Sequence, residues 1–287
     1  MYKGKGWEIL VPKRCQGFYS RDAFRLERAG DQIYSEEDSR RLEEARQDAV
    51  RKAKETRQDL RPNKLMGFAY AKEADSGAVV GLRQLDYITL GASVFMADAG
   101  DKEAGMKYAS NLGVMGTVRT IDSKTIHSKR RSNLASWGGY DSVFGCGLTG
   151  DENGDPDKLI ALGTGRLFDL MAQRVVVELG INEDDVEEIN LEGIVEAHPY
   201  GDHIIAFDVK VGVESGKILD RKEKLLKGPA GKKYEDIFCV DLRGEDVGNY
   251  LKSQKILTVA FGNLVLTGVN LFGQEWIDGL RRDGVLE

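Results

Sequence analysis

Two charged residues in the segment LGTGRLFDLMAQRVVVELGI, residues 162–181, have a spacing that could place both in one functional site. Apolar residues recur at helical intervals over residues 166–179, and Gly180 follows as a stop, so the segment predicts a helix. Arg174 and Glu178 are four positions apart and are therefore neighbours on one helix face. The two could belong to a functional site, or they could form an ordinary surface pair. The sequence leaves both interpretations open.

A basic cluster and an aromatic patch offer candidate ligand contacts. Lys129, Arg130 and Arg131 end a predicted strand. An arginine presents a two-pronged fork to phosphate or sugar oxygens, although a solvated strand end explains the same residues. Trp137 and Tyr140 flank two glycines, and they could stack on a base or sugar or simply anchor a loop. Arg130, Arg131 and Trp137 are therefore candidate substrate-binding residues.

Two histidines bracket the sequence PYGD. His198 and His203 lie five positions apart, and Asp202 adjoins the second. Such a set could bind a metal ion, but a turn between strands accounts for the proline, glycine and aspartate equally well. We therefore expect a turn here in preference to a metal site.

The most polar stretch of the chain predicts a long helix. Ser35 and Asp38 have the spacing of a capping box, and the helix is expected to cover residues 36–60 before Pro62 ends it. Its apolar residues form one narrow stripe of small side chains, which indicates a helix lying on a surface. The members of the stripe are Leu42, Ala45, Ala49 and Ala53.

The remaining pattern alternates strands and helices. Residues 114–120 and 124–129 predict a hairpin, and the Gly-, Asp- and Asn-rich residues 133–158 predict a long loop. Further strands are expected at residues 189–197, 203–214 and 236–243, followed by helices over 244–253 and 257–283. This order predicts a mixed α/β layer fold.

Composition narrows the class of protein. The 287 residues include 47 acidic and 41 basic side chains, for a net charge of −6, which disfavours nucleic acid as a partner. Three scattered cysteines, Cys15, Cys146 and Cys239, form no recognisable pair and favour a reducing compartment. No apolar run approaches the ~20 residues that span a bilayer. We therefore expect a cytoplasmic protein that does not enter a membrane.

The order of several segments resembles the Nudix hydrolases. The segments are GTVRTIDSKTIHSKRRS, GLTG, NLEGIVEAHPYGDHIIAFDVKV and KKYEDIFCVDL. The stretches NKLMGFAYA, GLRQLDYITLGASVF and NLFGQEWIDGL are similar to the larger subfamily that includes UDP-glucose pyrophosphatases. The resemblance covers residues 60–287. It implies an α/β (α+β) fold, with a Nudix-like α/β/α sandwich and mixed sheet over residues 111–287 and a helix-and-strand extension over residues 1–110.

The helix at residues 166–179 departs from the family motif, G-x5-E-x7-R-E-U-x-E-E-x-G-U. If Arg174 is the motif arginine, Val175 and Leu179 stand where the family has glutamates, and Glu178 is the one acid left. A divalent metal ion that assists diphosphate cleavage needs several oxygen ligands. By analogy with the family, Glu235 or Asp236 could supply them from a downstream segment.

The resemblance therefore implies two alternatives. In the first, the protein hydrolyses a nucleoside diphosphate-linked substrate such as UDP-glucose, with Mg²⁺ or Mn²⁺. Catalysis then falls to Glu178 and Glu235, metal binding to Glu178, Glu235 and Asp236, and substrate binding to Arg130, Arg131, Arg174 and Trp137. In the second, a Nudix-fold protein binds a nucleotide or sugar without cleaving it. Either form could be a homodimer.

Overall fold

The computed structural model describes most of the chain. The described residues are 3–4, 7–11, 18–19, 24–55, 64–74, 77–101, 103–108, 110–134, 138–148, 155–198, 201–228 and 230–287. Trp137 and Cys15 lie outside them. The fold combines a large mixed sheet with helices, which confirms the predicted α/β class.

The sheet is built around two parallel strands. β6 (Asn111–Thr120) runs parallel to β11 (Asp202–Val211), whose other neighbour, β10 (Val186–Ala197), is antiparallel to it. One side of the sheet continues through β2 (Trp7–Val11) to β1 (Lys3–Gly4). The other side continues through β4 (Lys64–Ala74) and β5 (Gly77–Asp86) to β3 (Phe24–Arg28). Strands from residues 1–110 thus form both edges of this path.

A branch of the sheet contains the predicted hairpin. β7 (Lys124–Arg130) folds back on β6 and pairs with β12 (Tyr234–Asp241). The loop predicted over residues 133–158 is wrong in part, since it contains β8 (Asp141–Ser142), β9 (Phe144–Gly147) and the start of α4 (Pro156–Leu162). The loop was predicted because glycines are common in this segment. At Gly145 a Cβ atom would collide with the Val114 carbonyl oxygen, so glycine here permits close strand pairing.

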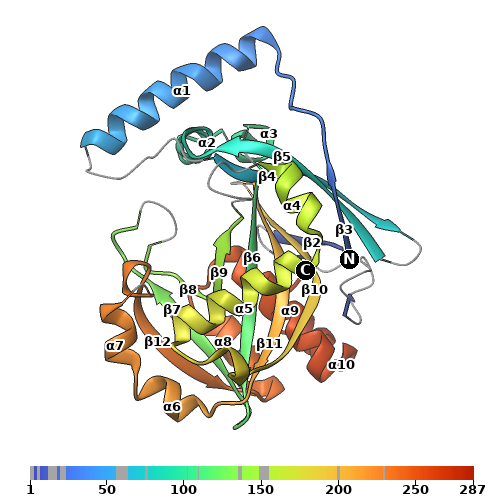
Figure 1. The fold of residues 1–287 in the computed structure, drawn as a ribbon, viewed down its shortest axis with the longest axis vertical. Helices are drawn as coiled ribbons and strands as arrows, with labels where there is room; N and C mark the ends of the chain where they lie inside the picture. The colour runs from blue at the N-terminus through green and yellow to red at the C-terminus, as the bar shows by residue number, and fades with distance from the viewer. Residues whose placement is uncertain are drawn as a thin grey trace.

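Two helices cover opposite faces of the central strands, as Figure 1 shows. α5 (Gly165–Leu179) packs on one face and α9 (Thr258–Phe272) on the other. β11 explains this arrangement, because its side chains alternate between faces. Ile205, Phe207 and Val209 belong to the core under α5, whereas Ile204 and Ala206 belong to the core under α9.

The other predicted helices are also present. α5 ends at Gly180, which has a φ of 62°, as the glycine stop predicted. The region predicted as helical at residues 257–283 is divided at Gly273 into α9 and α10 (Gln274–Arg282). The remaining helices are α6 (Ser215–Leu219), α7 (Lys222–Lys227), α8 (Gly244–Ser253) and the 3₁₀ turns Glu183–Asp185 and Ala230–Lys232.

The polar helix α1 (Glu36–Glu55) lies at one end of the molecule, beside α2 (Tyr87–Asp98) and α3 (Ala104–Tyr108) (Figure 1). The Asp38 amide donates to the Ser35 hydroxyl at 3.1 Å, so the helix starts as predicted. Leu42, Ala49 and Ala53 of the predicted stripe are buried. Residues 56–60, the expected last turn, lie outside the described residues. Within the described part of the chain, no helix combines the length and apolar character needed to cross a bilayer.

Candidate functional site

Helix α5 places Glu178 inside the protein. The buried face of the helix consists of Leu167, Phe168, Met171, Val175 and Leu179, which pack on the sheet. Glu178 lies on the edge of this face and is only 1% exposed. A buried carboxylate needs charged or hydrogen-bonding partners to offset the lost hydration. The identity of those partners therefore defines the site.

Three donors surround the Glu178 carboxylate. Lys233 Nζ lies 2.9 Å from Oε1, and the Tyr234 hydroxyl donates to Oε2 at 3.0 Å. Arg174 Nη1 lies 3.6 Å from Oε1, so the predicted neighbours form an ion pair between a buried carboxylate and a partly exposed guanidinium. The sequence left a surface pair and a site pair open, and the geometry supports a role inside the protein.

Tyr234 is a donor to Glu178 and not a source of negative charge. Burial raises the pKa of the Tyr234 phenol well above its usual value, and the charge of Glu178 and the hydrogen bond to it raise it further. The phenol therefore keeps its proton at neutral pH. We call Glu178, Lys233, Tyr234 and Arg174 the Glu178 cluster.

The other predicted metal ligands lie apart from this cluster. A β-bulge in β12 leaves Glu235 without a partner residue in the pairing between Tyr234 and Asp236. Glu235 Oε2 accepts from the Ser132 amide at 3.1 Å, and Asp236 forms an ion pair with Lys222. Both acids are thus held by groups outside the Glu178 cluster.

The Glu178 cluster does not fit a divalent metal ion. Hard cations such as Mg²⁺ take several oxygen ligands, usually carboxylates and waters. Here the groups nearest the one carboxylate are an ammonium, a guanidinium and a protonated phenol. Within the described ranges, one group of three metal-ligating side chains has converging ligand atoms, Glu8, Glu196 and His198, and α5 contributes nothing to it.

A cavity of about 290 Å³ opens beside the cluster. It lies where β6 and β11 begin and where α9 begins. Lys233 and Arg130 line it together with polar groups and apolar walls. Its other lining residues include Asn111, Cys146, His203, Leu65, Leu90 and Leu257.

Positive charge concentrates at this cavity. Lys233 donates to the Gly145 carbonyl at 3.1 Å and to Glu178, which leaves the third proton of its ammonium for a ligand. Arg130 adds a second cation, and Asp202 contributes one carboxylate to the lining. The N-terminus of α9 adds partial positive charge, because its N-cap, Leu257, has no side chain that can accept from the first-turn amides.

The predicted substrate-binding residues are divided by the structure. Arg130 lines the cavity, whereas Arg131 Nη1 donates to the Gly231 carbonyl at 2.9 Å and secures a turn. Arg174 is held near the cavity through Glu178 and through Cys146, a lining residue. Trp137 is outside the described residues. Lys233 is not among the residues predicted from the sequence, although the sequence KKY at the start of β12 places two lysines beside the predicted acids.

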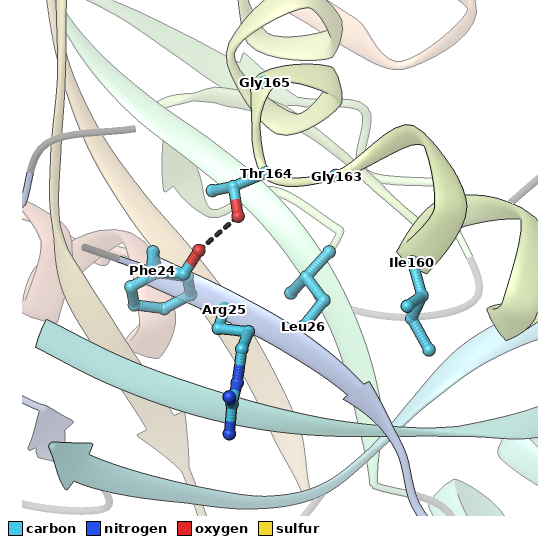
Figure 2. A pocket seen from close by; sticks show the side chains of 7 residues that line it. All are labelled: Phe24, Arg25, Leu26, Ile160, Gly163, Thr164 and Gly165. Carbon is cyan, nitrogen blue, oxygen red and sulfur yellow. Dashed lines mark hydrogen bonds between the residues drawn. The ribbon is translucent and has the colours of Figure 1, made fainter. Parts of the chain in front are cut away.

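A second cavity, of about 450 Å³, lies between β3 and the turn joining α4 to α5. Figure 2 shows the Thr164 hydroxyl directed at the Phe24 carbonyl oxygen, to which it donates, while Arg25 points away from that turn. The Arg25 side chain is 72% exposed. With its one cation turned to solvent, this cavity is a weaker candidate for an anionic ligand than the cavity beside Glu178.

Comparison with known proteins gives little further guidance. No model of a protein family matches the sequence, and no curated protein matches it. The solved structure of DR0079 from Deinococcus radiodurans is similar over 51% of this chain and 75% of that chain, with 8% sequence identity and a TM-score of 0.31. The fold and site thus define a mixed α/β protein with a buried ion-pair cluster beside a basic cavity.

Proposed function

We propose that this protein binds a small phosphate-bearing ligand, a nucleoside diphosphate or nucleotide sugar, in the cavity beside Glu178. In this proposal Glu178 is the counter-ion that positions Lys233 and Arg174, and it does not hold a metal ion. The observation that supports the proposal most directly is the arrangement of Lys233, which contacts Glu178 at 2.9 Å and lines the cavity.

The balance of charge favours an anionic ligand. Glu178 is one carboxylate, and it faces the two cations Lys233 and Arg174. Arg130 is a third cation at the cavity wall, where Asp202 is a second carboxylate, so the cations outnumber the acids by one. A phosphate group would bring the opposing charge, and it would also accept hydrogen bonds from an ammonium and from the first turn of a helix.

The shape of the cavity fits part of a nucleotide. Its volume of about 290 Å³ is at the lower end of the range for small-molecule sites. Apolar side chains, among them Leu65, Leu90 and Met115, could contact a base or sugar. The resemblance of residues 60–287 to Nudix proteins, which act on nucleoside diphosphate-linked compounds, adds support for this ligand class.

Metal-assisted hydrolysis has less support from the geometry. Cleaving a diphosphate requires cations that screen its charge and position water, and a hydrolase of this kind holds them with several acids. Glu178 is engaged by Lys233 and Tyr234, and Glu235 and Asp236 have their own partners. Binding without cleavage is therefore the function that the described residues support best.

The test compares two adjacent lysines. Lys233→Met removes the ammonium at the cavity, and Lys232→Met removes an exposed ammonium that does not line it. Calorimetric titration with UDP and UDP-glucose in the presence of a chelator should show binding to the wild type and to Lys232→Met. Because hydrogen bonds to charged groups contribute ~1.5–3 kcal/mol, Lys233→Met should bind roughly 10- to 100-fold more weakly.

Equal affinity in both lysine variants would contradict the proposal. So would an absence of binding to the wild type at millimolar ligand, since even one charge-assisted contact supported by an apolar wall should give measurable affinity. A circular dichroism melt of each variant distinguishes a lost ligand contact from a lost fold.

A further inference from the structure

Two adjacent strands bring a second group of ionisable side chains together, away from the Glu178 cluster. Glu8 on β2 pairs directly opposite Glu196 on β10, and His198 follows immediately after β10. One ligand atom from each of the three side chains lies within 4.8 Å of the other two. The antiparallel register therefore creates a compact set of two carboxylates and one imidazole.

Two glutamates in this position repel each other. Like charges directly opposite in an antiparallel pair destabilise the sheet unless a cation lies between them. Glu196 has little access to water, with a side chain only 8% exposed. The Glu8 side chain has no hydrogen bond or ion pair with another described residue. Positive charge placed between the two carboxylates would therefore relieve their repulsion.

A fourth side chain fixes the orientation of Glu196. His203 Nε2 lies 2.8 Å from Glu196 Oε2, while His203 Nδ1 lies 2.9 Å from the Gly201 carbonyl oxygen. The Phe68 ring stacks on the His203 ring at a centroid distance of 3.9 Å. His203 thereby leaves Glu196 Oε1 directed toward His198, whose Nε2 is 2.8 Å away. Metal-ligating carboxylates are commonly held by such outer hydrogen bonds.

We propose that Glu8, Glu196 and His198 bind one divalent transition-metal ion of the Zn²⁺ class. One imidazole nitrogen and two carboxylate oxygens are ligands that Zn²⁺ accepts in a four-coordinate site, with water in the remaining position. The imidazole disfavours Mg²⁺ and Ca²⁺, which prefer oxygen ligands. His198 Nε2 lies 2.8 Å from Glu196 Oε1, and the metal ion would bind between these two atoms.

The ion would join two parts of the chain that are far apart in sequence. β2 comes from the N-terminal region, and β10 is a central strand of the sheet. A metal bridge between Glu8 and Glu196 would hold β2 on β10 and relieve the repulsion between them. His198, with a side chain 43% exposed, leaves the site open to an ion from solution. This inference does not depend on the ligand proposed for the cavity.

The first experiment uses the unaltered protein. Chelator-treated protein is dialysed against excess buffer and titrated with ZnCl₂, and one equivalent should bind per chain. Co²⁺ then replaces Zn²⁺ as a spectroscopic probe, because its visible absorption reports the ligands. The proposal predicts d–d bands without a thiolate charge-transfer band. A strong thiolate band would show that cysteines bind the ion, and an absence of stoichiometric binding would overturn the site.

Two variants and one control test the assignment of ligands. Glu8→Gln and His198→Gln change side chains that are partly exposed, so the fold should survive. Each should weaken Zn²⁺ binding by roughly 10-fold or more, since even outer-shell partners account for ~10- to 100-fold. Glu187→Gln alters an exposed glutamate on the same strand, where it pairs with Lys210, and should bind Zn²⁺ as the wild type does.

Thermal melts complete the test. Zn²⁺ should raise the melting temperature of the wild type and of Glu187→Gln, and it should leave that of Glu8→Gln and His198→Gln unchanged. Zn²⁺ affinity that is the same in all four proteins would place the ion elsewhere and overturn the proposal. If either variant fails to fold, the Co²⁺ spectrum of the wild type still decides between nitrogen–oxygen and sulfur ligands.

Discussion

Two buried glutamates lie on opposite faces of the same sheet, and their surroundings differ. Glu178, on α5, faces the cations Lys233 and Arg174. Glu192, under α9, faces neutral donors instead. These are Thr267 Oγ1 at 2.7 Å, Asn270 Nδ2 at 3.0 Å and Asn263 Nδ2 at 3.4 Å.

The nearest cation on the α9 side serves another acid. Arg119 forms a two-pronged contact with Asp208, with both nitrogen–oxygen distances at 2.5 Å. Burial raises the pKa of Glu192 well above its usual value, and the negative charge of Asp208 raises it further. Its surroundings therefore favour the protonated form of Glu192, whereas Glu178 is the counter-ion of two cations.

The degree of burial does not distinguish these two glutamates, whereas the charge of their hydrogen-bonding partners does. Both glutamates are almost fully buried, and each accepts hydrogen bonds at both carboxylate oxygens. Lys233, a partner of Glu178, also lines the basic cavity, whereas no partner of Glu192 does. A ligand for this protein should therefore be an anion bound beside Glu178.

The largest effect on stability is expected at Glu178. Glu178→Gln keeps the size of the side chain but leaves Lys233 and Arg174 without their counter-ion. Breaking a fully buried pair costs ~3–5 kcal/mol. The Lys233 and Arg174 side chains are 35% and 38% exposed, so water offsets part of the cost, and we expect a loss of about 2 kcal/mol. Urea unfolding measures this loss in unfolding free energy. A loss below about 0.5 kcal/mol would contradict the role of Glu178 as the counter-ion of Lys233 and Arg174.

The opposite sign is expected at Glu192. A group whose pKa is raised on folding stabilises the folded state below its unfolded pKa of about 4.3, and this contribution is lost as pH rises through the folded pKa. Gln cannot titrate, so Glu192→Gln should gain stability relative to the wild type as pH rises from 4 to 8. Unfolding free energies at several pH values provide the test. A difference that does not vary with pH would mean that Glu192 is already ionised.

Removing one hydroxyl from each cluster compares the two sites directly. Tyr234→Phe deletes a donor to Glu178, and Thr267→Val deletes a donor to Glu192. A hydrogen bond to a charged group contributes ~1.5–3 kcal/mol and a neutral one ~0.5–1.5 kcal/mol. Tyr234→Phe should thus reduce the unfolding free energy more than Thr267→Val. The reverse order would contradict the assignment of charge to the two faces.

The smallest effects are expected from the acids downstream of α5. Glu235 and Asp236 make contacts with Lys129, Ser132 and Lys222 that are partly exposed to solvent. Surface pairs of this kind contribute ~0–1 kcal/mol. Glu235→Gln and Asp236→Asn should leave UDP-glucose affinity unchanged within about twofold in calorimetric titrations. A large loss of UDP-glucose affinity that appears only with Mg²⁺ would instead identify Glu235 and Asp236 as metal ligands.

Much of the fold could be predicted from local patterns. The glycine stop after α5, the Ser35 cap and the alternating strands β10 and β11 depend on neighbouring residues in the chain, and all are present. The secondary structure of residues 133–158 could not be predicted from local patterns. Its glycines suit a loop and a closely paired strand equally, and only the position of β6 decides between them.

The candidate site was harder to predict because it depends on contacts between distant segments. The spacing of Arg174 and Glu178 predicted that they are neighbours, which the structure confirms. Lys233 and Glu178 are 55 residues apart in the sequence, and no local sequence pattern predicts their contact. The same holds for Glu8 and Glu196, which are brought together by strand pairing alone.

One measurement tests the central claim most directly. Purified wild-type protein is incubated with UDP-glucose and Mg²⁺ or Mn²⁺, and release of UMP is followed alongside ligand binding in chelator. If Glu178 is a counter-ion in a binding site, UDP-glucose binds without added metal and no UMP appears. Metal-dependent release of UMP that disappears in Glu178→Gln would contradict the account and identify Glu178 as a metal ligand in a hydrolase.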